Sequence, residues 1–502
     1  MIEKPWKRIL IFGIVILTGC RPQPEEPHPR NVLFIAIDDL RPQLGCYNLP
    51  YMHTPNLDRL AAGGFVFDRH YVQVPTCGAS RYSLLTGRRP ATPDHLSNDV
   101  FARLTAGKPE GELPENFIHL LRNKGFRTAA VGKITHAPDG RVYGYEDDPS
   151  EVEELPHSWD LQPRVYGRWG TGWNAFFGYA DGSNRQSRHK EVPPYEMSPG
   201  PDTIYPDGMI TREALSLLDT LQNSGHPFFL AVGYYKPHLP WTVPQKYWDQ
   251  YAGDSLPPIP VQDIPGGADP SSLHASGEFN QYLAVQEHPD LQHPASAAYA
   301  NDLRRAYAAC VSYIDAQIGL LMQALDDRHL TDQTMIVIWG DHGWHLGDQR
   351  VWGKHTLSEY ALRSALILNL PGDTLRARHM AQPVETIDVF PTILEVLGQG
   401  KPDFAEGKSL LANLKGEPDD PSAAAFSFWQ RGISMRTNRY RLTQYLDHGK
   451  IYTELFDYQQ DPDESQNLAA TSAGIVQELM PRLQAQMPEY LRALFDQPGQ
   501  AK

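Results

Sequence analysis

NVLFIAIDDL, residues 31–40, is an uninterrupted apolar run, Val32 to Ile37, that ends in two aspartates, Asp38 and Asp39. Its composition, rich in β-branched and other apolar side chains, is typical of a strand buried on both faces of a parallel sheet. We therefore expect both carboxylates just past the carboxyl end of a buried parallel strand. Open α/β sheets bind their ligands at that edge.

Outward from this stretch, strand-like and helix-like segments alternate. Apolar runs with strand composition occur at 65–73, 126–133, 226–234, 334–340 and 364–370, and helical patterns at 54–63, 77–87, 115–125, 386–398 and around Tyr307. This alternation predicts an α/β fold with an open, doubly wound, mostly parallel sheet. From about Asp419 the pattern changes to antiparallel strands over 424–446 and a closing helix over 476–495, which predicts a smaller α+β subdomain.

The first thirty residues have the pattern of an export segment. Three basic residues precede an apolar run from Ile9 to Leu17, which is shorter than the ~20 residues that span a membrane. The ending LTGC, residues 17–20, resembles a bacterial lipobox, in which Cys20 is lipidated; a plain secretory signal with a chance cysteine is the alternative. We predict a signal peptide over 1–20, a tether over 21–30, a catalytic domain over 31–418 and a C-terminal subdomain over 419–502.

These segments predict an exported bacterial protein, periplasmic or on the cell surface, that contacts the membrane only through its lipid anchor. The net charge of −15 over 502 residues argues against nucleic acid as a partner. An anionic substrate therefore needs a local basic cluster. Two stretches with little periodicity, 138–206 and 251–295, interrupt the α/β pattern and are expected to cover the site. Their tryptophans and tyrosines, as in GTGWNAFFGY (170–179), and the polar run DGSNRQSRH (181–189) are candidates for the rim.

Two acidic pairs follow buried strands. Asp38-Asp39 ends the first strand, and Asp341-His342 follows the strand at 334–340. Read separately, Asp38 could cap a helix and Asp341 could begin a turn. Together they predict one metal site, because clustered carboxylates repel one another unless a cation lies between them, and oxygen-rich sites suit calcium or magnesium.

Basic and imidazole side chains occupy the other predicted strand ends. One lysine–histidine pair alone is usually structural, but three at one edge of a sheet supply a local positive field and groups that titrate near neutral pH. These pairs are Lys133 with His136, Lys236 with His238, and Lys354 with His355.

Cys77 lies in PTCGASRYSLLTGRRP, residues 75–90. A cysteine at a helix N-terminus near Arg81 is expected to have a lowered pKa and could act as a thiolate nucleophile. Calcium and magnesium prefer oxygen, however, so a thiolate is a poor neighbour for the predicted metal. Of the other cysteines, Cys310 is expected in a helix core, and a Cys46–Cys310 disulfide is open in an exported protein.

These residues resemble the type I sulfatases of the alkaline phosphatase superfamily. The family signature is Cys-x-Pro/Ala-Ser-Arg followed after four residues by Thr-Gly, as in Cys77 to Arg81 and Thr86-Gly87. Further blocks extend the resemblance over nearly the whole chain and are most similar to the iduronate-2-sulfatase branch. They are DDLRPQLGCY (38–47), TPNLDRLA (54–61), VGKITH (131–136), AVGYYKPHLP (231–240), GDHGWHLGDQRVWGKHT (340–356) and ELFDYQQDPDESQNLA (454–469).

The resemblance implies that a maturation enzyme oxidises Cys77 to formylglycine (3-oxoalanine), whose hydrate replaces sulfur with oxygen. It also implies that Asp38, Asp39, Asp341 and His342 bind one calcium ion, with magnesium as the alternative, together with residue 77. One hydrate hydroxyl then attacks the sulfate ester, and His136 takes the proton from the other hydroxyl, which expels sulfate. Further implied roles are that Arg81 holds the hydrate and that Lys133, His238 and Lys354 bind the sulfate or protonate the leaving alcohol.

The implied activity is release of sulfate from a sulfated carbohydrate; the branch suggests a 2-O-sulfated uronate such as iduronate 2-sulfate, and other polysaccharide sulfates are the alternative. Two positions depart from the commoner family pattern: Ala79 replaces proline in the maturation signal, and His342 replaces asparagine, as it does in the iduronate-2-sulfatase branch. A phosphodiesterase or phosphonate hydrolase on the same scaffold is one alternative. A lipoprotein that binds sulfated glycans without turnover is the other, and it would follow if Cys77 is not converted.

Overall fold

The computed structural model describes residues 1–2, 30–251, 256–371 and 378–497. The predicted signal peptide, the lipidation site Cys20 and most of the tether therefore lie outside the described residues, apart from the first two.

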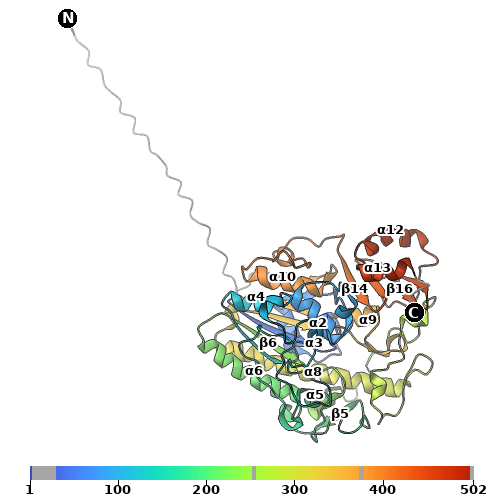
Figure 1. Ribbon diagram of the computed structural model, residues 1–502, viewed down its shortest axis with the longest axis horizontal. Helices are drawn as coiled ribbons and strands as arrows, with labels where there is room; N and C mark the ends of the chain where they lie inside the picture. Colours follow the sequence, from blue (N-terminus) through green and yellow to red (C-terminus); the bar gives the residue numbers. More distant parts are fainter. Residues whose placement is uncertain (3–29, 252–255, 372–377, 498–502) are drawn as a thin grey trace.

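A seven-stranded sheet forms the centre of the larger part of the molecule, in the order β12-β2-β11-β8-β1-β6-β4 (Figure 1). β1 pairs in parallel with β6 and β8, and β4 pairs in parallel with β6. β11 runs antiparallel to β8 and β2. The strands are β1 (Asn31–Ile37), β2 (Phe65–Phe67), β4 (Arg127–Gly132), β6 (Phe228–Tyr234), β8 (Thr334–Gly340), β11 (Leu366–Asn369) and β12 (Arg378–Met380). The predicted α/β class and mostly parallel sheet are confirmed.

Helices cover both faces of this sheet, as Figure 1 shows. Alternate side chains of β1 belong to different hydrophobic cores: Leu33 and Ile35 pack with α1 (Pro55–Ala62), α6 (Pro206–Asn223) and α8 (Ala297–Asp327). Val32 and Phe34 pack on the other face. The helices there are α2 (Cys77–Thr86), α4 (Phe117–Asn123) and α10 (Thr386–Val396). Burial of β1 on both faces explains its continuous apolar sequence.

α8 is long and apolar enough to cross a membrane, but 72% of that stretch is buried inside the molecule, so it is a core helix. Cys310 lies within it and is fully buried, as expected. Cys46 and Cys310 are both free thiols, so the disulfide considered between them is not formed.

A separate antiparallel sheet of four strands follows near the C-terminus, as expected: β14 (Ala424–Trp429), β15 (Gly432–Thr437), β16 (Tyr440–Asp447) and β17 (Lys450–Asp457). The prediction of a single closing helix over 476–495 is wrong in detail. This stretch forms two helices, α12 (Ala473–Ala485) and α13 (Glu489–Asp496), because Pro488 disfavours helical backbone in the residue before it and favours a new start after it. The boundary at residue 418 stays a prediction.

The strand predicted over 65–73 is also divided. β2 ends at Phe67, and β3 (His70–Tyr71) pairs with β13 (Val384–Glu385) in a separate two-stranded sheet. The irregular stretch 138–206 contains short elements, among them α5 (Gly172–Phe176) and β5 (Tyr195–Ser198). β5 pairs with β7 (Trp241–Pro244), which follows the loop after β6.

Candidate active site

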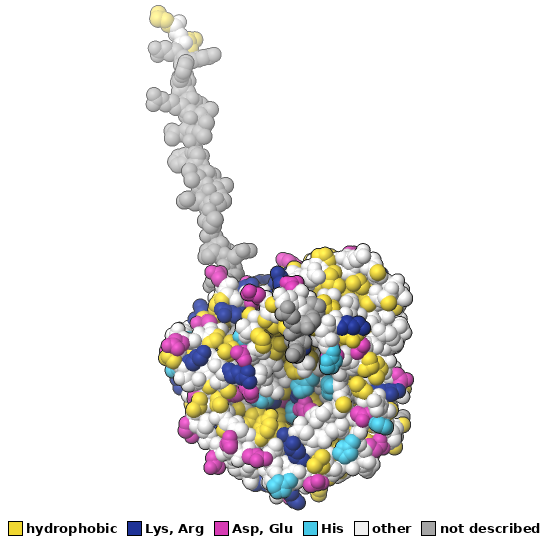
Figure 2. All heavy atoms as spheres, turned by 45° about the vertical axis from the view of Figure 1, so that its right-hand side comes forward, with side chains coloured by type: hydrophobic (Ala, Val, Ile, Leu, Met, Phe, Trp, Pro, Cys, Tyr) yellow, Lys and Arg dark blue, Asp and Glu magenta, His cyan; other side chains and the backbone are white. Residues whose placement is uncertain are grey.

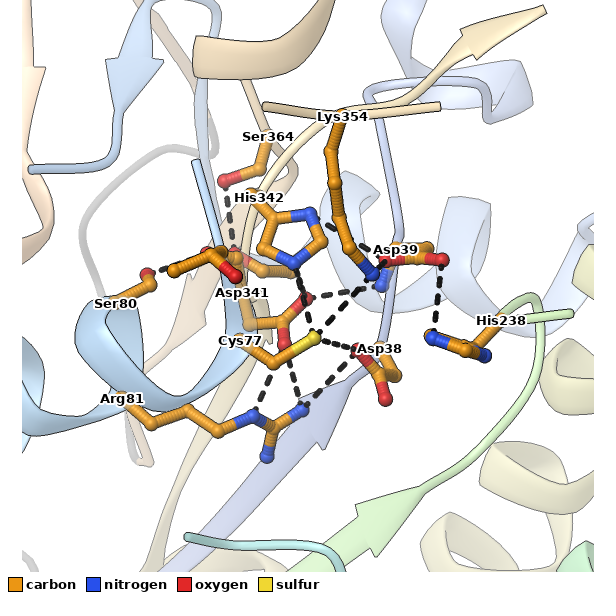
Figure 3. A network of polar contacts seen from close by, with 12 residues as sticks. Asp38, Asp39, Cys77, Ser80, Arg81, His238, Asp341, His342, Lys354 and Ser364 are labelled. Carbon is orange, nitrogen blue, oxygen red and sulfur yellow. Dashed lines mark hydrogen bonds and ion pairs between the residues drawn. The ribbon is translucent and has the colours of Figure 1, made fainter. Parts of the chain in front are cut away.

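Two neighbouring strands bring the acidic pairs together. Ile37 of β1 is paired with Gly340 of β8, so the residues that follow each strand emerge side by side (Figure 3). The backbone N–H of Asp39 donates to Asp341 Oδ1 at 2.9 Å. The expectation from the two strand ends, that these carboxylates share one edge, agrees with this geometry.

α2 delivers Cys77 to the same place. The helix begins at Cys77 after the extended residue Thr76. Cys77 Sγ lies 3.2 Å from Asp38 Oδ1 and 3.3 Å from His342 Nε2. It is also 3.5 Å from Lys354 Nζ. Residue 77 is therefore at the centre of the cluster in Figure 3.

The donor set is suited to a metal ion. Ligand atoms of Asp38, Asp39, Cys77 and His342 all lie within 4.8 Å of one another, and all four residues are buried. Asp39 Oδ2 is buried without a hydrogen-bond partner among the described residues. A buried carboxylate oxygen with no donor is costly, and a divalent cation would satisfy it.

Asp341 lies beside this donor set. Its Oδ2 accepts from Arg81 Nε at 3.0 Å, and Arg81 Nη2 is 2.9 Å from the same oxygen. Its Oδ1 is 3.6 Å from His342 Nε2. The Arg81 guanidinium also donates to the backbone carbonyl of Lys133. Arg81 thus joins the ends of β4 and β8 below residue 77.

Lysines neutralise the two strand-end aspartates. Lys133 Nζ donates to Asp38, and Lys354 Nζ donates to Asp39 Oδ1 at 3.0 Å. Burial acts to raise the pKa of Asp38, but Lys133 and the other nearby cations hold that pKa well below its ordinary value. At Asp39 burial dominates, and the pKa is raised despite Lys354.

The lowered pKa expected for Cys77 is wrong. Burial, followed by the negative charge of Asp38, raises the pKa of the Cys77 thiol to about 12, although Lys133 and Lys354 act in the opposite direction. The helix N-terminus does not overcome desolvation at a site that is 2% exposed. An unmodified Cys77 is therefore a protonated thiol at neutral pH and a poor nucleophile.

The two candidate histidines have different surroundings. His136 is partly buried, its Nδ1 is buried without a hydrogen-bond partner among the described residues, and its ring lies 5.2 Å from that of Trp173. Burial and Lys133 hold the pKa of His136 well below its ordinary value, so its ring is neutral. His238 Nδ1 faces the Leu239 carbonyl at 2.6 Å, and its Nε2 faces Glu278 Oε1 at 3.0 Å.

Glu278 was not among the predicted site residues. Its Oε1 is 3.3 Å from Lys354 Nζ as well as 3.0 Å from His238 Nε2, so it joins two predicted substrate-binding side chains. Its Oε2 is buried without a hydrogen-bond partner in the described part of the chain. Glu278 comes from the irregular stretch 251–295, where no strand end marks it. The only signal in the sequence was that this stretch was expected to cover the site.

Two further members of the lysine–histidine pairs lie outside the donor cluster. Lys236 Nζ donates to the backbone carbonyls of His238 and Pro240 at 2.9 and 2.7 Å, so it shapes the loop after β6. His355 Nε2 lies 3.1 Å from Thr76 Oγ1, and its ring stacks on Trp429 of β14. His355 thus connects the residue before Cys77 with the C-terminal sheet.

Comparisons with known proteins agree with this arrangement. The family model described as Sulfatase matches residues 30–399, and the model described as N-sulphoglucosamine sulphohydrolase, C-terminal, matches residues 340–492. A protein of Formosa agariphila named Sulfatase is 31% identical, over 91% of this chain and 87% of its own. Human iduronate 2-sulfatase is 29% identical, over 82% of this chain and 73% of its own.

A solved structure shares the fold with a TM-score of 0.70 and 21% identity, covering 95% of this chain and all of its own. It is described as a complex of a protein with its substrate D-glucosamine-2-N,6-O-disulfate.

Proposed function

Because the chain belongs to the sulfatase family, we propose that it releases sulfate from a sulfated saccharide by means of formylglycine derived from Cys77. The observation that carries this proposal is the position of Cys77 Sγ among two carboxylates, an imidazole and the Lys354 ammonium group. A protonated thiol is of little use there, whereas the hydrated aldehyde supplies oxygen atoms that bind a hard cation and attack sulfur.

Asp38, Asp39, Asp341 and His342 would hold the metal ion, which we propose is calcium, with residue 77. The cation would supply charge that stabilises the sulfate oxygens in the transition state. Lys133 and Lys354 add fixed positive charge on the same side, since both are buried beside the cluster. Preorganised charges of this kind, removed from water, are usually the largest contribution to catalysis.

Proton transfer falls to the histidines. His136 is neutral and has a free, buried Nδ1, which suits a base that accepts the proton of residue 77. Burial, followed by the charge of Lys354, lowers the pKa of His238 to about 4, so its ring is neutral and carries a single proton. We propose that this proton lies on Nε2, which faces Glu278 Oε1 at 3.0 Å, and that it serves the leaving alcohol. Arg81 would help to fix the position of the residue 77 side chain, since its guanidinium lies 2.9 Å from Asp341 and 3.8 Å from Asp38, which border residue 77 (Figure 3).

The proposed substrate is a glycosaminoglycan or a similar polysaccharide sulfate, with a 2-O-sulfated uronate as the first compound to assay. The name of human iduronate 2-sulfatase and the disulfated glucosamine in the solved structure support a sulfated sugar as the substrate.

We also propose export as a bacterial lipoprotein anchored through Cys20. Labelling with radioactive palmitate should mark the wild-type chain and not Cys20→Ala.

Mass spectrometry tests the modification. After expression with a formylglycine-generating enzyme, the tryptic peptide ending at Arg81 should carry an aldehyde at position 77, and Cys77→Ala should fold but release no sulfate. A peptide that retains its thiol in a fully active preparation would refute the mechanism. An inactive protein with an intact thiol that still binds sulfated glycans would instead favour the binding lipoprotein.

Metal removal tests the cation. Dialysis against a chelator should abolish sulfate release, and added calcium should restore it more fully than magnesium. Activity that survives chelation would count against a metal at Asp38 and Asp39.

A parallel assay with a phosphodiester and a phosphonate monoester tests the alternative activity. Faster turnover of either ester than of every sulfate ester would favour a phosphodiesterase or phosphonate hydrolase.

A further inference from the structure

One wall of the site is built from aromatic side chains of residues 170–189, which we call the rim hairpin. Gly178 and Asn184 form an antiparallel bridge that closes it. The Phe176 ring lies 4.5 Å from the ring of His238, and Trp173 contacts His136. The hairpin therefore borders both candidate proton-transfer residues.

Arg185 is buried in this wall without an acidic partner. It is 4% exposed, and no carboxylate of the described residues forms an ion pair with it. Its guanidinium carbon lies 3.7 Å from the ring centroid of Phe177, 5.6 Å from that of Tyr282 and 5.9 Å from that of Tyr145. Its Nε donates to Gln186 Oε1 at 3.2 Å.

Two other buried arginines are neutralised by carboxylates. Arg81 pairs with Asp341, and Arg441 in the C-terminal sheet pairs with Glu464. Ring faces offset only part of the cost of burying a cation, about 0.5–2 kcal/mol for each contact. An anion brought by a ligand would complete the neutralisation of Arg185.

Arg185 lies close to the reacting groups. The Phe177 ring, over which it stacks, is 6.3 Å from the ring of His238, so one aromatic side chain separates them. Tyr145, whose ring is 4.6 Å from that of Trp173, is 43% exposed and so opens to solvent. A saccharide entering over Tyr145 would meet Arg185 on its way to His238.

We propose that Arg185 determines specificity by binding a second anionic group of the saccharide, a carboxylate or a second sulfate, while Lys133 and Lys354 hold the sulfate that is removed. This inference rests on the proposed sulfatase function. A guanidinium binds either group through two parallel hydrogen bonds, and Tyr145 offers a ring face to the sugar. Arg185 is a specificity residue and takes no part in the bond-breaking step.

The test compares substrates with one and two negative groups. Arg185→Met keeps an unbranched side chain against Phe177 but removes the charge. We expect kcat/KM to fall about 10- to 100-fold, as for loss of a charged hydrogen bond, on a disaccharide with 2-O-sulfated iduronate or on D-glucosamine-2-N,6-O-disulfate. The compound on which kcat/KM falls shows whether Arg185 binds a carboxylate or a second sulfate. On 4-methylumbelliferyl sulfate, which has no second anion, the rate should stay within about twofold.

Arg188→Met is the matched control, because Arg188 is in the same hairpin, is exposed and pairs with Asp181 at 2.8 Å. It should leave all substrates unaffected. Equal losses of kcat/KM for Arg185→Met on all three substrates, or no loss on any, would overturn the role of Arg185.

If Arg185→Met does not fold, the wild-type enzyme provides the test. Removal of the second anion from the substrate, by carboxyl reduction of the uronate or by omitting the 2-N-sulfate, should lower kcat/KM by the same factor. Equal kcat/KM values for substrates with and without the second anion would overturn the inference. A wild-type enzyme that releases sulfate from none of these compounds would overturn the proposed function as well.

Discussion

At the scale of single residues, each of the three buried aspartates of the site has a cationic partner from another segment. Asp38 is paired with Lys133, Asp39 with Lys354, and Asp341 with Arg81. Such pairs are costly to break, because the remaining charge stays buried without compensation. Substitutions that keep size but remove charge therefore report on the electrostatics of the site.

Glu278→Gln tests the residue that the sequence did not reveal. Loss of its charge leaves Lys354 with fewer acidic partners and replaces the charged acceptor that orients His238 with a neutral amide, so kcat should fall about 10- to 100-fold. Steady-state sulfate release on 4-methylumbelliferyl sulfate measures the effect. Glu191→Gln is the control, because Glu191 is an exposed residue just after the rim hairpin. Wild-type kcat for Glu278→Gln would show that Glu278 only packs beside the site.

At the scale of elements, the position of α2 decides where residue 77 lies. Gly78 is the second residue of this helix, and a Cβ placed on it would lie 2.4 Å from the backbone oxygen of Asn98. Asn98 also accepts from the Gly78 N–H through Oδ1 at 2.9 Å. Glycine at this position thus permits close approach of the helix start to the segment before α3 (Val100–Leu104).

Gly78→Ala should displace the start of α2. Because the blocking atom belongs to the backbone, the helix must shift, and we expect kcat/KM to fall about 100-fold, as for a misplacement of about 1 Å. The mass of the residue 77 peptide should be recorded in parallel to separate geometry from failed maturation. Gly474→Ala, at the second residue of α12 with open space around it, should be neutral. Unchanged kinetics for fully modified Gly78→Ala would contradict the argument.

His70 of β3 contacts α10 and the loop before β11, and it makes stability depend on pH. Its ring lies between Ser364 Oγ at 3.0 Å and Thr386 Oγ1 at 2.8 Å, and burial lowers its pKa to about 3. The unfolded chain binds a proton here below about pH 6.5 and the folded chain only near pH 3. Stability is therefore retained above pH 6.5 and lost as the pH falls, by up to about 1.4 kcal/mol per pH unit.

Denaturant unfolding between pH 7.5 and 5 tests this linkage. His70→Gln should show a smaller loss of unfolding free energy over that range than the wild type, although it is less stable at pH 7.5. His448→Gln, at an exposed histidine, should keep the wild-type slope. A His70→Gln slope equal to that of the wild type would contradict the prediction.

At the scale of the whole molecule, the C-terminal sheet is tied to the catalytic part through buried charge. Glu464 is fully buried, pairs with Arg441 of β16 and accepts from Ser358 Oγ at 3.0 Å. Ser358 is four residues after Lys354, in the loop that also contains His355. The sheet therefore supports the loop that delivers Lys354.

Glu464→Ala should destabilise the protein by about 3–5 kcal/mol, because Arg441 would remain buried without its partner. Thermal unfolding measures the change. Asp463→Ala is the neighbouring control, since the Asp463 side chain has no ion pair among the described residues. A midpoint for Glu464→Ala equal to that of the control would mean that this pair does not hold the two parts together.

The sequence alone determined the α/β class, the acidic pairs at two strand ends and the family, because strand composition and the spacing of the Cys77 motif are local in the chain. It predicted eight of the site positions used here by their place after strands, including Lys133 and His238. Only the tertiary structure decided the direction of the Cys77 pKa shift, the contacts of Glu278 with His238 and Lys354, and the burial of Arg185 without an acidic partner. These properties depend on burial and on contacts between distant segments, such as Lys354 with Asp39, 315 residues apart. The irregular stretches that contribute Arg185 and Glu278 have no periodicity from which such contacts follow.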